Sequence, residues 1–186
     1  MVGIIILNYN NISDIINCID SLCETMSMTD VKILVMDNGS SMDVRTKVGN
    51  YLQEKFRTMS YTCIEGGDLN DKSIDLPKMT YQVLPSNIGY ARGNNEGIKL
   101  LSMDPSISEV LILNSDIILT EDILPPLLNH LNLLDNVGAI SPLLRKPDGR
   151  IDYCCARKSL AKQELLLTFS YVGAKKYQKA LDNRKC

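Results

Sequence analysis

The chain has 186 residues, of which 45% are hydrophobic and 23% are charged. This composition is typical of a soluble globular protein, and the length suffices for one buried α/β core but not for two full domains. Eight of the 20 Lys and Arg, but only two of the 22 Asp and Glu, lie in residues 157–186. The body is therefore acidic and the tail basic. An acidic body argues against nucleic acid as a partner, because such binding needs Lys and Arg to replace phosphate counterions.

The cysteines and the single histidine do not form a metal-binding pattern. The six cysteines include no Cys-x-x-Cys pair, and His130 has no partner at a known ligand spacing, which argues against a zinc site or a Cys-His nucleophile. Met1 leads directly into the apolar run 2–7, which is too short for a signal-peptide core, and no apolar stretch of about 20 residues is present. We therefore expect a cytoplasmic protein.

Apolar β-branched runs alternate with helical patterns along the chain, which is typical of parallel strands joined by crossover helices. We predict an α/β fold with a doubly wound, mostly parallel sheet flanked by helices. Strands are expected at 2–7, 31–36, 61–64, 81–84, 110–113 and 137–141, and helices after Asn10 or Asn11 and at 43–56, 89–103 and 121–134. Residues 65–78 read as a surface excursion, 147–149 as a turn, and the segment beyond Ser159 as a basic helix.

Polar residues follow three of these strands directly. In open parallel sheets, ligands bind beyond the carboxyl ends of the strands. Neighbouring parallel strands would bring the three polar segments to one crevice. These segments are Asn8-Tyr9-Asn10, Asp37-Asn38-Gly39-Ser40-Ser41 and Asn114-Ser115-Asp116.

Two carboxylates at these strand ends are candidates for ligand contacts. Asp37 can accept the imino N–H of uracil, thymine or guanine, although Asp-Asn-Gly-Ser is equally typical of a plain turn before a helix. Asp116 suits Mg²⁺ or Mn²⁺, which proteins hold with one or two carboxylates plus substrate phosphates. The alternative role for Asp116 is to cap a following helix.

Glycines recur four residues apart in the segment 87–97. Gly89, Gly93 and Gly97 would lie on one face of a helix, where they permit close approach of a sheet or a ligand. Arg92 lies off this stripe and could reach a diphosphate. The segment is neither a Gly-x-Gly-x-x-Gly nor a Walker pattern, which argues against a dinucleotide-binding dehydrogenase or a P-loop enzyme. Tight helix packing alone remains an open alternative for the glycines.

The ordered combination of these segments resembles family 2 glycosyltransferases, and most closely their bacterial rhamnosyltransferase-like members. The shared features are Asn-Tyr-Asn after the first strand, then Asp-Asn-Gly-Ser, then Asn-x-Gly-x-Ala-x-Gly-Asn-Asn-x-Gly, then Leu-Asn-Ser-Asp, with Val-Gly-Ala-Ile-Ser-Pro following. The resemblance covers about residues 1–155. It implies a GT-A fold, with residues 1–156 as the nucleotide-sugar-binding domain. By composition, residues 157–186 read as a basic helical tail, which could be the start of an acceptor-binding half.

The resemblance also implies roles for individual residues. Asp37 would contact the base, and Asn114-Ser115-Asp116 would replace the family's Asp-x-Asp motif, with Asp116 as the metal ligand. The departure from that motif leaves Asn114 without a charge. The nucleotide-binding residues implied or inferred are Asn8, Tyr9, Asn10, Asp37, Asn38, Gly89, Arg92, Gly93, Asn114 and Ser115.

The implied activity is inverting transfer of a hexose from a UDP or dTDP sugar, with Mn²⁺ or Mg²⁺, to a polysaccharide or lipid-linked acceptor during cell-surface polysaccharide synthesis. The family's later acidic segment, which would supply the general base, has no match after Cys155, so the sequence reads as an N-terminal fragment without its acceptor half. Two alternatives stay open: an inactive nucleotide-sugar-binding module, and a nucleotidyltransferase, which should carry a Gly-rich basic segment at 8–13. The basic tail could contact the inner face of the cell membrane or mediate oligomerisation.

Overall fold

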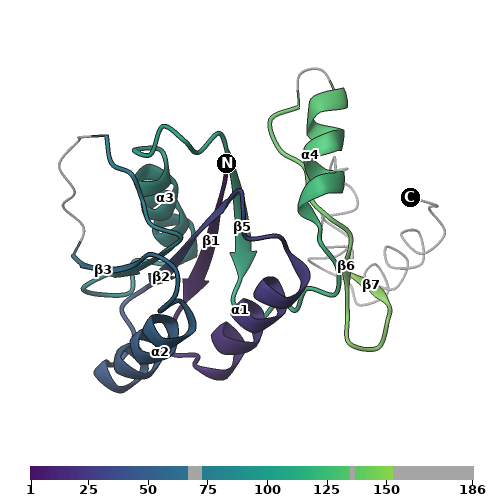
Figure 1. Cartoon of the computed structure of the whole chain (residues 1–186). Coiled ribbons are helices and arrows are strands. Elements are labelled where there is room, and N and C mark those ends of the chain that lie inside the picture. The colour runs from purple at the N-terminus through teal and green to yellow at the C-terminus, as the bar shows by residue number, and fades with distance from the viewer. Residues whose placement is uncertain (67–72, 135–136, 153–186) are drawn as a thin grey trace, which may run out of the picture. The chain divides into compact units, whose positions relative to one another are not determined.

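The computed structural model describes residues 1–66, 73–134 and 137–152, which belong to two compact units. The first unit, Met1–Leu124, alternates strands and helices from the start (Figure 1). Its elements are β1 (Val2–Asn8), α1 (Ser13–Thr25), β2 (Val31–Asp37), α2 (Met42–Lys55), β3 (Tyr61–Glu65), β4 (Met79–Val83), α3 (Tyr90–Leu101) and β5 (Glu109–Asn114).

The five strands form one sheet in the order β3-β4-β2-β1-β5, and each recorded pairing is parallel. The predicted α/β fold with a doubly wound, mostly parallel sheet is confirmed. Within the sheet β2, β1 and β5 are direct neighbours, and the register pairs Asn8 with Asp37 and Leu7 with Asn114. The three polar segments therefore end at the same edge, as the sequence predicts.

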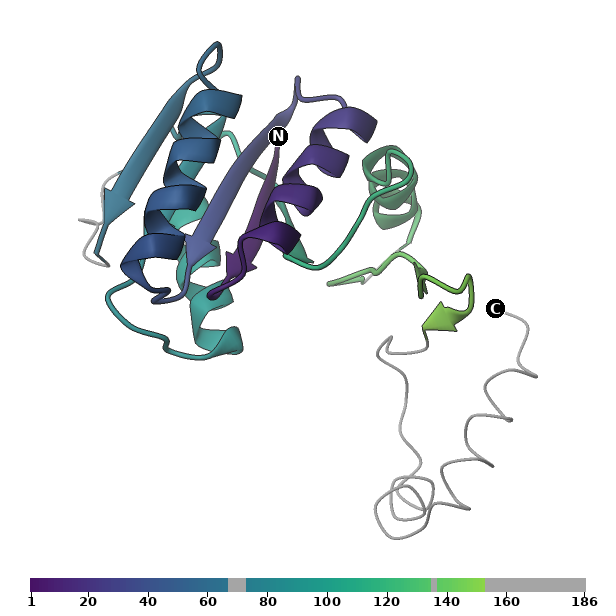
Figure 2. The ribbon, with the colours of Figure 1, turned by 90° about the horizontal axis from the view of Figure 1, so that it is seen from below.

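Helices cover both faces of the sheet: α1 and α2 lie on one face and α3 on the other (Figure 2). Two glycines set how closely α3 packs. A Cβ on Gly93 would lie 2.8 Å from Leu7 Cδ1, and one on Gly97 would lie 3.1 Å from Ile5 Cδ1. These two glycines thus allow the helix to pack closely on the sheet. The sequence alone did not distinguish this role from contact with a ligand.

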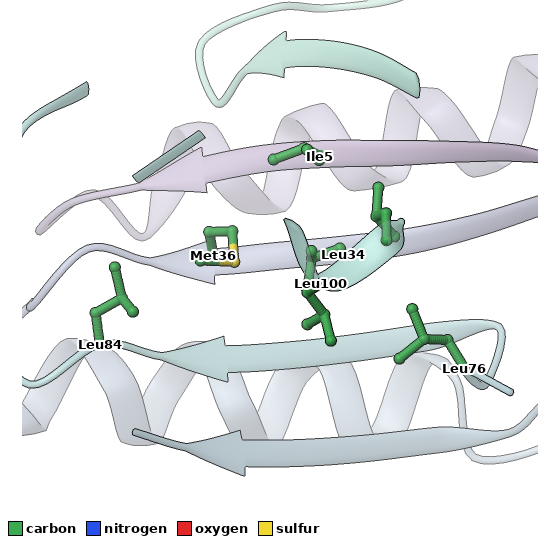
Figure 3. Close-up of a cluster of buried hydrophobic side chains, with 7 residues drawn as sticks. Ile5, Leu34, Met36, Leu76, Leu84 and Leu100 are labelled. Atoms are coloured by element: carbon green, nitrogen blue, oxygen red, sulfur yellow. The ribbon is translucent and has the colours of Figure 1, made fainter. Parts of the chain in front are cut away.

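The apolar core on the α3 side of the sheet joins β1, β2, α3, the segment before β4 and the residue directly after β4 (Figure 3). The residue Leu76, which belongs to the predicted surface excursion 65–78, is only 5% exposed and is part of this core. For residues 73–78 the prediction is therefore wrong, because Leu76 and the partly buried Ile74 pack inward. The core cluster consists of Ile5, Leu34, Met36, Leu76, Leu84, Leu100 and Leu101.

The second unit begins at Pro125 and contains most of α4 (Leu124–Leu133), followed by the hairpin of β6 (Leu144–Arg145) and β7 (Ile151–Asp152). The predicted turn at 147–149 is confirmed, since the Gly149 N–H donates to the Lys146 carbonyl at 2.8 Å. The predicted strand at 137–141 is wrong: these residues form no ladder, and a strand persists only when a neighbour accepts its backbone hydrogen bonds.

Several expectations fall outside the described residues. The proposed domain boundary at 156 and the basic helix beyond Ser159 lie there. Among the residues that are described, no helix is both long and apolar enough to cross a membrane.

A buried ion pair joins elements at the amino end of the sheet. Lys32 Nζ of β2 lies 2.7 Å from Asp104 Oδ2, and both side chains are less than a tenth exposed. Asp104 also accepts hydrogen bonds from the Leu76 N–H and from both the N–H and hydroxyl of Ser106. Burial alone would raise the pKa of Asp104, but the bonds from Lys32, Ser106 and Leu76 hold it well below its usual range.

We predict that Asp104→Asn lowers the free energy of unfolding at pH 7 by about 3–5 kcal/mol, because it removes the buried charged partner of Lys32 and leaves only the exposed carboxylate of Asp75. A group with a depressed pKa stabilises the fold above its unfolded pKa, here about 3.9, and loses this contribution as the pH falls. Urea unfolding of wild type and variant should therefore converge as the pH drops below about 4.

The matched control is Asp75→Asn, which removes the other carboxylate bonded to Lys32 Nζ, at 2.6 Å, but from a side chain that is 94% exposed. We expect it to cost less than about 1 kcal/mol. Equal losses in the two variants would contradict a specific role for the buried pair.

Candidate functional site

Asp37, at the end of β2, is fully buried and already bonded within the protein. Its Oδ1 accepts the Ser40 N–H at 2.7 Å, and its Oδ2 accepts the Tyr81 hydroxyl at 3.3 Å. Arg45 Nε of α2 lies 3.5 Å from the same carboxylate. Burial and the neighbouring Asp37 raise the pKa of Tyr81 far above its usual value, so this phenol stays protonated and donates. Because the side chain is fully buried, a base could meet the carboxylate only if the residues around it moved.

The loops after β1 and β2 are cross-linked by hydrogen bonds. The Asn10 N–H donates to Ser40 Oγ at 2.9 Å, and Asn10 Oδ1 accepts the Ser41 N–H at 2.8 Å. These bonds hold Asn10 in the left-handed region, with φ 51°, which Asn tolerates better than most residues. Asn10 and its neighbour Tyr9 remain exposed beyond the end of β1.

A glycine allows the loop after β2 to touch the loop before α3. Gly39 has φ 81°, and a Cβ there would lie 2.2 Å from the carbonyl carbon of Ser86. Only glycine fits this position, for both conformational and steric reasons.

Asn38 connects the end of β2 to the start of α3. Its Nδ2 donates to Asn87 Oδ1 at 3.1 Å and to the Gly89 carbonyl at 3.3 Å, while its Oδ1 accepts the Ile88 N–H at 3.0 Å. The side chain is 3% exposed, so its amide bonds to other protein groups and not to solvent. These bonds place the N-terminus of α3 beside the polar end of β2.

The segment Asn114-Ser115-Asp116 begins with the last residue of β5, and α1 contacts it. The Cys18 thiol lies 3.7 Å from the Asn114 carbonyl oxygen, and Ser21 Oγ accepts the Leu119 N–H at 3.1 Å. Burial, and secondarily the charge of Asp116, raise the pKa of Cys18 to about 12, so the thiol keeps its proton. Asp116 is exposed and caps no helix, since α4 begins at Leu124.

The predicted site residues therefore divide into an exposed and a buried set. Four polar side chains from the strand ends and Arg92 are accessible, whereas Asn8 is wholly buried and neither of its amide atoms has a hydrogen-bond partner among the described residues. Exposed are Tyr9, Asn10, Gly89, Arg92, Asn114 and Asp116, Ser115 is intermediate, and Asn8, Asp37, Asn38 and Gly93 are buried.

The sequence did not single out the residues that hold this arrangement. Arg45 and Tyr81 contact Asp37, and Tyr90 donates its hydroxyl to Asn114 Oδ1 at 2.7 Å. Arg45 and Tyr81 carry no local signal, because they come from α2 and from the neighbouring strand β4. Tyr90 lies inside the glycine-bearing segment, and its position at the first turn of α3 is the one signal that could have drawn attention to it.

A separate groove of about 600 Å³ runs between α2 and the edge of the sheet formed by β3 and β4. Its described lining contains Arg45 and Tyr81, the partners of Asp37, together with Gln53, Tyr61 and Glu65. None of the predicted site residues lines it, so the groove is distinct from the predicted site at the strand ends.

Comparison with known proteins assigns the chain to a family. The model of the family described as Glycosyl transferase family 2 matches residues 3–154, and the chain belongs to this family. The family assignment and the GT-A-like fold predicted from the sequence are thereby confirmed, while the closer resemblance to rhamnosyltransferase-like members stays a prediction. A search of curated proteins gave no match.

We predict that Asn38→Asp lowers the free energy of unfolding by about 1–3 kcal/mol. The substitution replaces the Nδ2 donor with an oxygen that faces two acceptors, Asn87 Oδ1 and the Gly89 carbonyl. Urea unfolding at pH 7 measures the loss. The control is Asn95→Asp on the exposed face of the same helix, which should change stability by less than about 0.5 kcal/mol. Equal effects would show that Asn38 does not fix α3.

Proposed function

We propose that the crevice at the ends of β1, β2 and β5 binds a nucleoside-diphosphate sugar of the UDP or dTDP type together with Mn²⁺ or Mg²⁺. The observation that carries this proposal is the position of α3. Asn38, directly after β2, bonds the Gly89 end of α3, and the Tyr90 hydroxyl bonds it to β5, so a helix N-terminus lies beside the polar ends of both strands.

This position suits the diphosphate of the donor. The first N–H groups of a helix have no partner within the helix, and the helix dipole adds positive potential there. Together they make a helix N-terminus an anion site. Arg92 is exposed in the first turn of α3 and supplies a positive charge. The gain in binding would come from the diphosphate rather than from the sugar.

The residues at the end of β5 fit a metal held jointly by protein and ligand. Asp116 presents an exposed carboxylate, and the described residues contain no cluster of three His, Cys, Asp or Glu side chains that would bind an ion unaided. Mg²⁺ in particular is often held by one or two carboxylates plus substrate phosphates. A metal bound in this way neutralises the diphosphate as it leaves.

The base would lie against the exposed Tyr9 and Asn10 beyond β1. Asp37 can act on it in two ways: directly, after release from Tyr81, or indirectly through Ser40, which accepts the Asn10 N–H. Both routes make Asp37 important for nucleotide binding, but only the first selects the base.

The proposed reaction type, acceptor and cellular role rest on membership of the family. The proposed activity is inverting hexosyl transfer to a polysaccharide or lipid-linked acceptor at the cytoplasmic side of the membrane, in cell-surface polysaccharide synthesis. Membrane contact or oligomerisation through the tail concerns residues 157–186, outside the described part of the chain. An acceptor-dependent release of nucleoside diphosphate would distinguish a transferase from an inactive binding module.

Thermal unfolding with UDP, dTDP, GDP and ADP, each with and without Mn²⁺, tests the donor site. A ligand at about 100 times its Kd stabilises the folded state by about 2.7 kcal/mol, which raises the Tm by several degrees for a chain of this size. We expect UDP or dTDP to do so, and Mn²⁺ to increase the shift. No shift with any of the four nucleotides would refute the proposed function.

For the metal, we predict that Asp116→Asn removes the Mn²⁺-dependent part of nucleotide binding and leaves the Tm of the free protein unchanged. The variant keeps the shape of the side chain but loses the charge that attracts the cation. Asp43→Asn, which neutralises another exposed carboxylate at the start of α2, is the control and should keep the full metal effect. Equal enhancement by Mn²⁺ in Asp116→Asn and wild type would exclude Asp116 as the ligand.

For the base, we predict that Asp37→Ala weakens UDP binding by more than the ~1 kcal/mol of an ordinary hydrogen bond, measured by titration calorimetry. A loss confined to UDP and dTDP would indicate direct contact with the base. A similar loss for ADP, reproduced by Ser40→Ala, would indicate that Asp37 acts by ordering Asn10. Unchanged affinity for every nucleotide would remove Asp37 from the site.

A further inference from the structure

Tyr90 is an exposed aromatic residue that makes a specific contact in the crevice. It is the first residue of α3, its side chain is 58% exposed, and its hydroxyl lies 2.7 Å from Asn114 Oδ1 at the end of β5. The phenol O–H donates and the amide oxygen accepts. The ring lies mostly in solvent, so core packing does not account for the placement of this residue.

The contact determines which atoms of Asn114 are available to a ligand. A carboxamide offers one acceptor oxygen and two N–H donors. Oδ1 accepts the Tyr90 hydroxyl with one of its two lone pairs, which fixes the orientation of the amide, and no described residue bonds the two N–H groups on Nδ2. Such donors attract an anion and repel a cation. Through these donors Asn114 is suited to bind an oxygen of a diphosphate.

The same contact brings two kinds of donor together. Tyr90 belongs to the first turn of α3, where the backbone N–H groups are unpaired within the helix, and its side chain reaches the last residue of β5. The Asn114 amide and the helix N-terminus are therefore separated by no more than the length of the Tyr90 side chain. One diphosphate group can contact both.

We propose that Tyr90 is a positioning residue that orients Asn114, so that the Asn114 amide N–H groups and the N-terminus of α3 bind the same diphosphate. This inference rests on the proposed function, and it leaves Asp116 as the charged metal ligand of Asn114-Ser115-Asp116. In this division of roles, the first position of the segment binds the leaving group and the third binds the cation.

The test is calorimetric titration of the full chain with UDP and with uridine, with and without Mn²⁺, for Tyr90→Phe, Asn114→Ala and the double variant. Each single variant should weaken UDP binding about tenfold, which corresponds to one hydrogen bond to a charged group. The factor should be the same with and without Mn²⁺, and uridine binding should not change. The double variant should lose no more than either single variant, because both remove the same contact.

Two further measurements separate this role from a general structural effect. Tyr51→Phe is the matched control, since the Tyr51 hydroxyl also donates over 2.7 Å, to Asp20 Oδ1, but between α2 and α1. It should leave UDP affinity unchanged. In NMR spectra the side-chain NH₂ signal of Asn114 should shift on addition of UDP but not of uridine, and Tyr90→Phe should reduce that shift.

Several outcomes would overturn the proposal. Wild-type affinity in Tyr90→Phe would show that the hydroxyl does not position Asn114. A loss in Asn114→Ala that appears only with Mn²⁺ would make Asn114 a metal ligand, and additive losses in the double variant would show that the two residues act separately. If wild-type protein binds UDP and these results follow, only this inference fails; if it binds no nucleoside diphosphate, the proposed function fails as well.

Discussion

The buried carboxylate of Asp37 is the constraint on which the polar end of the sheet depends. A charge without solvent contact costs several kcal/mol unless hydrogen bonds and an opposite charge compensate for it. Asp37 gets these from three elements: the Ser40 N–H after β2, the Tyr81 hydroxyl of β4, and Arg45 of α2. The contacts of this one carboxylate thus hold the loop after β2, strand β4 and helix α2 in place beside the end of β2. Arg45 extends the network by donating to the Leu84 carbonyl at 3.0 Å.

A second buried ion pair joins several elements at the opposite, amino end of the sheet. Lys32 and Asp104 hold β2, the segment before β4 and the turn after α3 together. Between the two polar ends the interior is mostly apolar, although Thr80, Gln82 and Asn94 are also buried there, and α3 approaches the sheet closely because Gly93 and Gly97 carry no side chains. Hydrophobic contact is non-directional, whereas the hydrogen-bonded charges at the two ends form only where their partners lie in place, so they add specificity to this arrangement.

The sequence predicted the parts of the site that depend on local pattern. Parallel strands with polar ends had to converge, so the grouping of Asn8, Asp37 and Asn114 followed from the alternation of strands and helices. Which of these side chains face solvent could not be predicted. That depends on partners such as Tyr81, which lies 44 residues from Asp37 in the chain. Likewise, the strand expected at 137–141 has a suitable composition, but strand formation requires a neighbour that a pattern cannot specify.

The division between buried and exposed groups also bears on the charge of the crevice. A diphosphate is an anion, and two exposed carboxylates at the strand ends would repel it. Asp37 is withdrawn from solvent and lies beside Arg45, so the exposed charges of the predicted site are Arg92 and Asp116. Arg92 favours the diphosphate directly, but Asp116 opposes it unless a cation lies between them. Because Asp37 is buried, Asp116 is the only carboxylate of the predicted set whose charge the donor would meet. The proposed metal dependence should therefore rest on Asp116 alone.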